Sequence, residues 1–421
     1  MGYNVKNHNR SKIEKLLKKG VQISDPQSVE IGPEVDIDRI SGNGVVIYSG
    51  CKIFGRSMLI LQGSKLGHEG PVTLKNCQLG PKVELKGGFF RDAVFLKNVS
   101  MGSGSNVREG TILEEESRVA HSVGLKQTIL LPFVTLGSLI NFCDCLMAGG
   151  TSRKDHSEVG SSFIHFNYTP NQDKATPSLI GDVPRGVMLN QRPIFLGGQG
   201  GLVGPCRLEF GTVTAAGSII RIDELRPGRL IFSGTGRGGS IPFMPGMYQN
   251  IKRIVLNNIT YIANLIALMQ WYAYVRSQFI SDDFTEPLFV ALKEKLRMAI
   301  DERIQRLKAL SQKMPDSVIA YQNYTKENAS SRILKQKNEF LERSDELEDY
   351  FRSQENIAVE ENLRDAFMEK IRQGAQTSGK DYISVIKGLK DTEKVHGTLW
   401  LQSIVDHIID DAFEFLPSFN T

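Results

Sequence analysis

A repeat of aliphatic residues at six-residue intervals is the feature that most limits how this chain can fold. The repeat runs through Val107, Leu113, Val119, Leu125 and Leu131. That step matches neither the 3.6-residue period of a helix nor the two-residue period of a strand. In a hexapeptide β-helix, three short strands form each turn and place one aliphatic side chain per face inward. Stacked turns bury together what one turn could not, so the repeat predicts a β-solenoid.

The same interval returns along the first half of the chain, with shifts in phase between the runs. The further runs are Ile31 and Ile37; Ile47, Ile53 and Leu59; Leu79 and Leu85; Leu130 and Leu136; Val213 and Ile219. The alternative is a β-sandwich with accidental spacing. A sandwich would show period-two alternation broken by turn signals every ~8 to 12 residues. The six-residue runs therefore favour the solenoid.

Glycine marks a change of composition near residue 246. Of the 40 glycines, 36 fall at or before Gly246 and four come after it. Residues 233–246 are rich in glycine, serine and proline, as expected for the exit from the solenoid and a linker. Because 421 residues exceed the usual single core, two domains are expected. We predict an N-terminal linker helix in residues 1–20, a β-helix in 21–240 and an all-α region in 241–421.

Helical periodicity follows the linker. In residues 248–280, aliphatic residues recur at steps of three and four, which indicates one apolar helix face. Asn257, Asn264 and Gln270 interrupt this segment, so we predict a buried core helix and no membrane span. Later segments are charged and amphipathic, and they predict either a helical bundle or an appendage that lengthens a trimer: residues 286–313, 332–355, 360–374 and 381–415.

The net charge and the cysteine content limit which binding partners and which cellular compartment are expected. The net charge of +4 comes with no dense basic tract, so no nucleic-acid partner is expected. The five cysteines are odd in number and scattered, which matches a reducing compartment and predicts a cytoplasmic location. Cys143 and Cys145 are interpreted as ordinary strand residues, because their spacing suits neither a zinc pair nor a redox motif. No metal site is predicted.

Several short motifs occur along the chain in the same order as in a known protein family. They are residues 11–26 (SKIEKLLKKGVQISDP), Arg108-Glu-Gly-Thr, Ser122-Val-Gly-Leu-Lys126, Asn167-Tyr168, Ile180-Gly-Asp182 and Ala216-Gly-Ser-Ile-Ile-Arg221. Together they resemble the acetyltransferase half of the bifunctional N-acetylglucosamine-1-phosphate uridyltransferase / glucosamine-1-phosphate acetyltransferase family, over roughly residues 11–223. The resemblance implies a left-handed β-helix, a homotrimer with shared sites and acetyl-coenzyme A as co-substrate. It also implies a nucleotide sugar or amino sugar phosphate as the acceptor.

The resemblance does not extend to the nucleotidyltransferase half of that family. No counterpart of its Gly-rich, Arg-bearing nucleotide loop stands before Ser11 or after Gly246. A uridyltransferase activity is therefore not expected.

The resemblance also implies roles for individual residues. Arg108 and Lys126 match the residues that bind the acceptor's phosphate, and a guanidinium fork with a compact ammonium suits that role. Asn167 and Tyr168 match an Asn-Tyr pair at the acetyl-coenzyme A site. Arg221 matches a basic residue near the nucleotide phosphates of coenzyme A.

The chain departs from the family at the catalytic base. Counting from Lys126 without a gap, Ser138 stands where the family has a histidine. Asn141 takes the place of a sugar-contacting tyrosine, and Glu158 falls near the family's asparagine on the following turn. A serine hydroxyl cannot remove an amine proton near pH 7 without its own base.

Two histidines could replace the missing base. His165 lies two residues before Asn167, and His156 lies in residues 151–156, part of a six-residue lengthening between Phe142 and Gly160. Such an insertion preserves the phase of the repeat while it places new polar groups near the site. The catalytic candidates are thus Ser138, His165 and His156.

Three classes of function stay open at this point. The first is acetyl-coenzyme A-dependent N-acetyl transfer to an amino sugar phosphate or nucleotide sugar. The second is a non-catalytic sensor or scaffold that keeps the Arg108 and Lys126 phosphate site and binds a sugar nucleotide. The third is a metal-dependent enzyme similar to γ-class carbonic anhydrase, which needs three converging histidines. The seven histidines contain no close ligand pair, which disfavours the third class.

Overall fold

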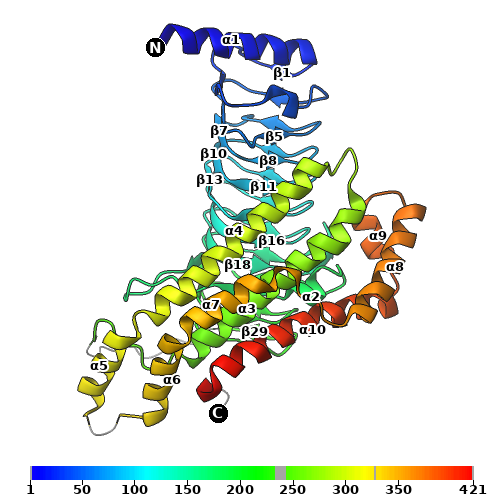
Figure 1. Ribbon diagram of the computed structural model, residues 1–421. Helices are drawn as coiled ribbons and strands as arrows, with labels where there is room; N and C mark the ends of the chain where they lie inside the picture. The colour runs from blue at the N-terminus through cyan, green and yellow to red at the C-terminus, as the bar shows by residue number, and fades with distance from the viewer. Residues whose placement is uncertain (1, 233–242, 327–328, 420–421) are drawn as a thin grey trace.

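The first half of the chain forms a solenoid of parallel β-strands, and the second half forms helices that lie along its side (Figure 1). The computed structural model describes residues 2–232, 243–326 and 329–419. Residues 233–242, the greater part of the predicted linker, lie outside the described residues. The predicted fold class, a hexapeptide-repeat β-helix followed by an all-α region, is confirmed. The division at residues 20 and 240 stays a prediction.

Each turn contributes strands to three faces. An eleven-stranded sheet forms the first face: β1 (Gln22–Ile23), β3 (Val46–Ile47), β6 (Lys65–Leu66), β9 (Glu84–Leu85), β12 (Ser100–Met101), β15 (Arg118–Val119), β17 (Thr135–Leu136), β21 (Glu158–Val159), β24 (Phe195–Leu196), β27 (Val213–Thr214) and β29 (Leu230–Ile231).

A second sheet of sixteen strands bends along β16 (Gly124–Leu130) and β18 (Asn141–Met147) to form the other two faces. The second face comprises the first halves of these strands with β2 (Glu30–Ile31), β4 (Lys52–Phe54), β7 (Val72–Lys75), β10 (Gly88–Arg91), β13 (Ser105–Val107), β22 (Ile164–Phe166), β25 (Gly201–Val203) and β28 (Ile219–Ile220). The third face comprises their second halves with β5 (Leu59–Ile60), β8 (Gln78–Leu79), β11 (Ala93–Phe95), β14 (Thr111–Leu113), β23 (Ser178–Ile180) and β26 (Cys206–Leu208).

The predicted aliphatic rows fill the interior. Val107 is aligned with Leu125, and Leu113 with Leu130, on adjacent turns, and all four side chains are buried. Leu131 belongs to no inward row, because the turn from Leu113 to its partner Leu130 holds 17 residues and not 18. The phase therefore shifts by one residue at this point, and Leu131 is buried at the corner instead.

The predicted six-residue insertion is a hairpin. β19 (Gly150–Ser152) pairs with β20 (Asp155–His156) in antiparallel fashion, outside the solenoid ladder. The ladder resumes in phase, since Thr135 is aligned with Glu158 and Leu136 with Val159. The insertion thus leaves the interior row intact, as predicted.

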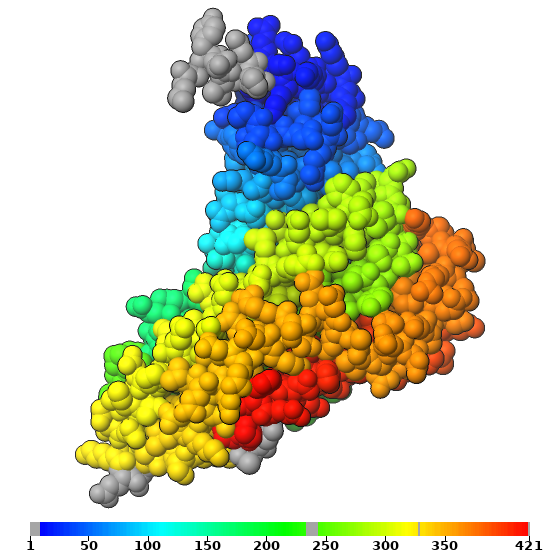
Figure 2. All heavy atoms as spheres, viewed as in Figure 1, coloured from blue at the N-terminus to red at the C-terminus, as the bar shows by residue number. Residues whose placement is uncertain are grey.

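The helices after the linker cover the third face. They are α3 (Lys252–Gln270), α4 (Glu286–Ser311), α5 (Met314–Thr325), α6 (Ser331–Glu342), α7 (Ser344–Ser353), α8 (Glu361–Thr377), α9 (Tyr382–Gly388) and α10 (Asp391–Phe415), with a short α2 (Val183–Gly186) inside the solenoid segment. α4 contacts β8, β11 and β14, and α3 contacts β23. Figure 2 shows the helical segments, yellow-green to red, lying against one side of the solenoid. A role of these helices in lengthening a trimer stays a prediction.

The outward side chains of the third face explain this arrangement. Strand residues alternate between inward and outward positions, so Val94, Ile112, Ile129, Leu146 and Leu179 point away from the interior. All five are nevertheless buried, at 5% exposure or less. Aliphatic side chains thus occur on both sides of this face, and the helices bury the outer set.

Three helical segments bear on the predictions made from the sequence. α1 (Gly2–Lys19) lies across the N-terminal end of the solenoid (Figure 1) and buries Ile13 and Leu16. The segment Lys252–Phe279 is long and apolar enough to pass a membrane-span criterion, but 89% of its apolar window is buried within the molecule. It is therefore a core helix of the folded chain. α5 lies between two of the predicted helical segments, and Pro315 occupies its first turn, where a proline is tolerated.

Candidate functional site

The outward side chains of the second face bring several predicted residues together. Val107 and Leu125 are aligned and point inward, so their neighbours Arg108 and Lys126 lie side by side on the outer surface. Asn141 starts β18, aligned with Gly124 on one side and Ile164 on the other. Arg108, Lys126 and Asn141 therefore share one exposed surface on consecutive turns.

Glu109 organises the charges around Lys126. Its carboxylate accepts from Lys126 Nζ at 2.9 Å and from Arg91 Nη2 at 2.5 Å. Burial opposes ionisation of Glu109, but the hydrogen bonds from Lys126 and Arg91 lower its pKa to about 2. Lys126 is thus held in position by a fixed carboxylate. Arg108 reaches the thiol of Cys143 and has no carboxylate partner among the residues that the structure describes.

Gly124 leaves a gap in this surface. A Cβ atom built at Gly124 would meet only Asn141 Oδ1, at 3.6 Å, within 4 Å. The outward position before Lys126 therefore has no side chain of its own. Asn106 of the preceding turn and Asn141 of the next turn are both exposed and border it. Amide groups with a cation beside an open position suit a polar ligand such as a sugar.

Ser138 lies at the corner between the first and second faces, next to a histidine that the sequence did not single out. Its Oγ is 3.0 Å from Nδ1 of His121 on the preceding turn. Its backbone N–H donates to Ser161 Oγ of the following turn at 3.2 Å. The left-handed backbone at Ser122 and Leu139, with φ of 57° and 59°, forms this corner on the two turns. Stacked corners bring together side chains that are 17 residues apart.

His165 points into the solenoid. It is 1% exposed and aligned with the inward Leu202, while its neighbours Ile164 and Phe166 are 43% and 40% exposed. Its Nδ1 is 2.6 Å from the carbonyl oxygen of Cys143, and its Nε2 is 2.7 Å from Ser178 Oγ. Burial lowers its pKa to about 4. The imidazole thus stays neutral near pH 7, with both ring nitrogens occupied by protein partners.

His156 and Glu158 lie on another part of the surface. His156 ends the inserted hairpin, and its Nε2 is 3.6 Å from a carboxylate oxygen of Glu158 on the first face. Burial, followed by the charge of Arg153, lowers the pKa of His156. This pair is separated from Arg108 and Lys126 by the corner that holds Ser138.

Asn167 and Tyr168 follow β22 at the edge between the second and third faces. Asn167 Nδ2 donates to Asp144 Oδ2 at 2.7 Å, and the ring of Tyr168 is 56% exposed. Asp144 in turn accepts from Arg303 of α4. The helical region therefore helps to fix Asn167, a connection that no motif in the sequence indicated.

Arg221 belongs to the same outward column as Lys126, four turns further on. The register runs from Lys126 through Cys143, Phe166 and Val203 to Arg221. The column thus has cations at two points with a largely apolar stretch between them. Arg221 is exposed.

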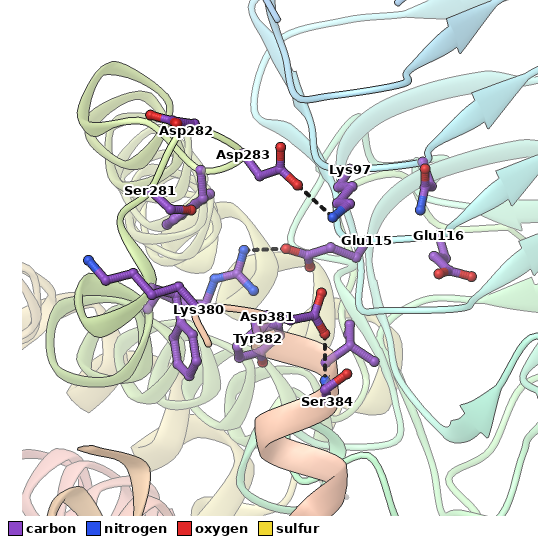
Figure 3. Close-up of a pocket in the computed structure, with 15 residues that line it drawn as sticks. Lys97, Glu115, Glu116, Ser281, Asp282, Asp283, Lys380, Asp381, Tyr382 and Ser384 are labelled. Atoms are coloured by element: carbon purple, nitrogen blue, oxygen red, sulfur yellow. Dashed lines mark hydrogen bonds and ion pairs between the residues drawn. The ribbon is translucent and has the colours of Figure 1, made fainter. Parts of the chain in front are cut away.

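A separate cavity of about 580 Å³ lies between a solenoid corner and the helices (Figure 3). Its lining contains an excess of carboxylates: Glu115, Glu116, Asp282, Asp283 and Asp381, against Lys97, Arg276 and Lys380. Lys97 and Asp283 form an ion pair of 2.6 Å in it. Because acidic linings repel phosphates, and because none of the predicted site residues lines this cavity, it is not the predicted site. Among the described residues, no group of three or more potential ligands is placed to hold a metal ion.

Curated proteins match about half of the chain's length. No protein-family model matches the chain. The bifunctional protein GlmU of Thermotoga maritima is 29% identical over 216 residues, which are 50% of this chain and 42% of that protein. The corresponding figures are 30% over 216 residues for the protein of Fervidobacterium nodosum and 26% over 226 residues for that of Corynebacterium aurimucosum.

These matches are partial on both sides. They cover 41% of the Fervidobacterium and Corynebacterium proteins, so the chain spans about two fifths of the curated relatives it matches. Together with the parallel β-solenoid, they support a relationship of about half of this chain to the GlmU acetyltransferase-like family.

Proposed function

We propose that this protein transfers an acetyl group from acetyl-coenzyme A to the amine of an amino sugar phosphate or nucleotide amino sugar. The observation that carries the proposal is the contact between Ser138 and His121, 3.0 Å apart, at the edge of the surface that holds Arg108 and Lys126. A phosphate-binding pair and an imidazole on one exposed surface are the two groups that this reaction needs from the protein.

These groups have two roles in the reaction, substrate binding and proton transfer. Arg108 and Lys126 bind the acceptor's phosphate, and Asn141 orients the sugar. The sugar amine attacks the thioester carbonyl carbon, a C–N bond forms and the C–S bond breaks. His121 accepts the amine proton, with Ser138 Oγ positioned to relay it, and the proton then goes to the departing thiolate. Imidazole is the usual general base in proteins, and it supplies the base that serine lacks.

Outward side chains on the second face form a path that suits acetyl-coenzyme A. Arg221 binds its nucleotide phosphates, and the apolar side chains of Phe166 and Val203 contact its pantetheine arm. Asn167 and Tyr168 border this path at the edge between the second and third faces. His156, which lies beside Glu158, is the alternative base, and its replacement provides the comparison below. His165 is buried with both ring nitrogens occupied, so it does not reach the acceptor amine.

A homotrimer completes the proposal. A closed ring of identical subunits needs two different surfaces that bind each other. The helices cover the third face, and the first and second faces remain. Both faces have exposed apolar side chains, with Phe195 at 42% on the first face and Ile164 at 43% on the second. We propose that these faces meet around a threefold axis in the cytoplasm.

The test uses the full chain with acetyl-coenzyme A and either glucosamine 1-phosphate or uridine diphosphate glucosamine, and it follows free thiol. We expect turnover that falls by about 100-fold or more in His121→Ala. His156→Ala, the matched histidine outside this surface, leaves turnover within about twofold. Turnover that survives His121→Ala but is lost in His156→Ala would overturn the choice of base. Absence of turnover with every amino sugar tested would overturn the proposed reaction.

A second candidate is a binding protein without catalysis. It is favoured by Ser138, which occupies the position of the family's histidine, beside an intact Arg108 and Lys126 pair. In that case uridine diphosphate N-acetylglucosamine binds without turnover, and the double variant Arg108→Ala/Lys126→Ala abolishes binding. Binding that is unchanged in the double variant would rule this candidate out.

A further inference from the structure

Cations extend the Arg108 and Lys126 pair by two more turns toward the N-terminus. Lys75 is aligned with Arg91 on the second face. Phe90 is aligned with Val107, so Arg91 lies beside Arg108. Lys75, Arg91, Arg108 and Lys126 thus form one outward column on four consecutive turns, which we call the cation column. Adjacent strands are ~4.8 Å apart, so like charges stand directly opposite one another, an arrangement that is unfavourable without a counter-charge.

The protein supplies only part of that counter-charge. Glu109 pairs with Arg91 and Lys126, and Asp92 lies 3.7 Å from Arg91 Nε. Lys75 and Arg108 form no ion pair with any residue in the described ranges. Asp92 is also 3.9 Å from Lys295 of α4, so its charge is shared. The column therefore attracts an anion with more than one charge, distributed over more than one turn.

An exposed aromatic ring stands beside the column. Phe89 is 36% exposed, and it precedes Arg91 by two residues, so both side chains point outward from β10. Its partner on the next turn is Asn106, which is exposed too, and the position after that is Gly124. A hydrophobic ring on a solvent-exposed strand suits a flat ligand, and a nucleobase stacks on such rings.

We propose that the acceptor is a nucleoside diphosphate amino sugar, with the base on Phe89, the diphosphate along Arg91 and Arg108, and the sugar in the gap at Gly124. The sugar then lies next to Asn141, and its amine faces Ser138 and His121. This inference rests on the proposed function and refines it, because a sugar 1-phosphate needs neither Phe89 nor the cations beyond Arg108. A nucleoside diphosphate uses Phe89 and Arg91 as well as Arg108.

Calorimetry with three probes tests the inference: uridine diphosphate N-acetylglucosamine, N-acetylglucosamine 1-phosphate and uridine diphosphate. We expect the nucleotide sugar to bind at least about tenfold more tightly than the sugar phosphate. Phe89→Ala is expected to weaken binding of both uridine ligands by about tenfold, the effect of losing one base–aromatic stack. Arg91→Ala weakens the same two ligands. Neither variant changes binding of the sugar phosphate by more than about twofold.

The helical region offers matched controls away from the proposed site and the proposed trimer faces. Tyr324→Ala removes an exposed ring from α5, and Arg332→Ala removes an exposed guanidinium from α6. Neither control changes binding of any probe. Equal effects of Phe89→Ala and Tyr324→Ala would overturn the stacking role.

The two proposals fail differently. If the sugar phosphate binds as tightly as the nucleotide sugar and Arg108→Ala weakens both, the inference is wrong and the proposed function stands. If none of the three probes binds, both are wrong.

Discussion

Arg303 of α4 donates a hydrogen bond of 2.7 Å from Nη2 to Oδ1 of Asp144 on β18. The two side chains are 2% and 4% exposed. Asp144 uses its other oxygen to accept from Asn167. One buried ion pair therefore links the helical region to a residue of the candidate site.

Arg303→Ala is expected to lower the free energy of unfolding by about 3 to 5 kcal/mol, because it leaves the Asp144 carboxylate buried and unpaired. Urea unfolding measures this loss of stability. Arg306→Ala on the same helix removes a partly exposed ion pair with Glu302 and is expected to cost less than about 1 kcal/mol. Equal losses in the two variants would contradict this account of the pair.

Ile129→Ala is expected to cost about 2 to 5 kcal/mol, as for a core residue, although its side chain points out of the solenoid. The reason is its 1% exposure beneath the helices. Asn106→Ala, an outward position on the second face, is expected to change the free energy of unfolding by less than about 0.5 kcal/mol. Both values come from chemical denaturation, and a small effect at Ile129 would show that the helices do not cover that face.

Stability should fall in acid through His165. Burial lowers its pKa to about 4, well below the ordinary value of 6.5. The unfolded chain therefore takes up a proton between these values while the folded chain does not, so the free energy of unfolding decreases as pH falls from about 6.5 to 4. The full loss is about 3 kcal/mol. In His165→Gln this part of the pH dependence disappears, and an unchanged pH profile would contradict the assignment.

Glu114 should lower the free energy of unfolding as pH rises, whereas His165 lowers it as pH falls. Burial, and more weakly the charge of Glu115, raises its pKa to about 7, and Tyr272 donates a hydrogen bond to it at 2.5 Å. The folded chain then retains a proton that the unfolded chain loses, so the free energy of unfolding decreases as pH rises from about 4.5 to 7. Glu114→Gln keeps an acceptor for Tyr272 and is expected to raise stability at pH 8. Thermal unfolding at pH 5 and pH 8 measures this, with Glu116→Gln as the control that shows no such difference.

Arg221→Ala should raise the KM for acetyl-coenzyme A by about tenfold to 100-fold and leave the KM for the acceptor unchanged. A charge-assisted hydrogen bond to a phosphate has about this value. Initial rates with each substrate varied in turn measure both constants. A rise confined to the acceptor's KM would contradict the role given to Arg221.

The solenoid could be predicted because its interior repeats along the chain itself. The helices on the third face could also have been foreseen, since Ile112-Leu113 and Ile129-Leu130 are adjacent aliphatic pairs, and only one residue of each pair can point inward. The inward rows alone do not indicate what covers the second member of each pair.

The neighbourhood of Ser138 could not be derived in the same way. Its partner His121 is 17 residues away, and turn lengths vary where loops and the hairpin interrupt the repeat. His165 shows the reverse difficulty. Ile164 and Phe166 flank it, and alternation suggests that the apolar neighbours point inward, but the register with Leu202 places the histidine inside. Phase in a solenoid is set by the stacked turn and not by local hydrophobicity.

The apolar outer surface of the third face has a consequence for synthesis. The ribosome releases the solenoid first and the helices that cover Val94, Ile112 and Ile129 last. At ordinary elongation rates, some 5 to 20 residues per second, that surface stays uncovered for roughly 10 to 40 s. The nascent chain passes through a stage in which a complete β-helix exposes the apolar outer surface of its third face. Chaperones would bind there.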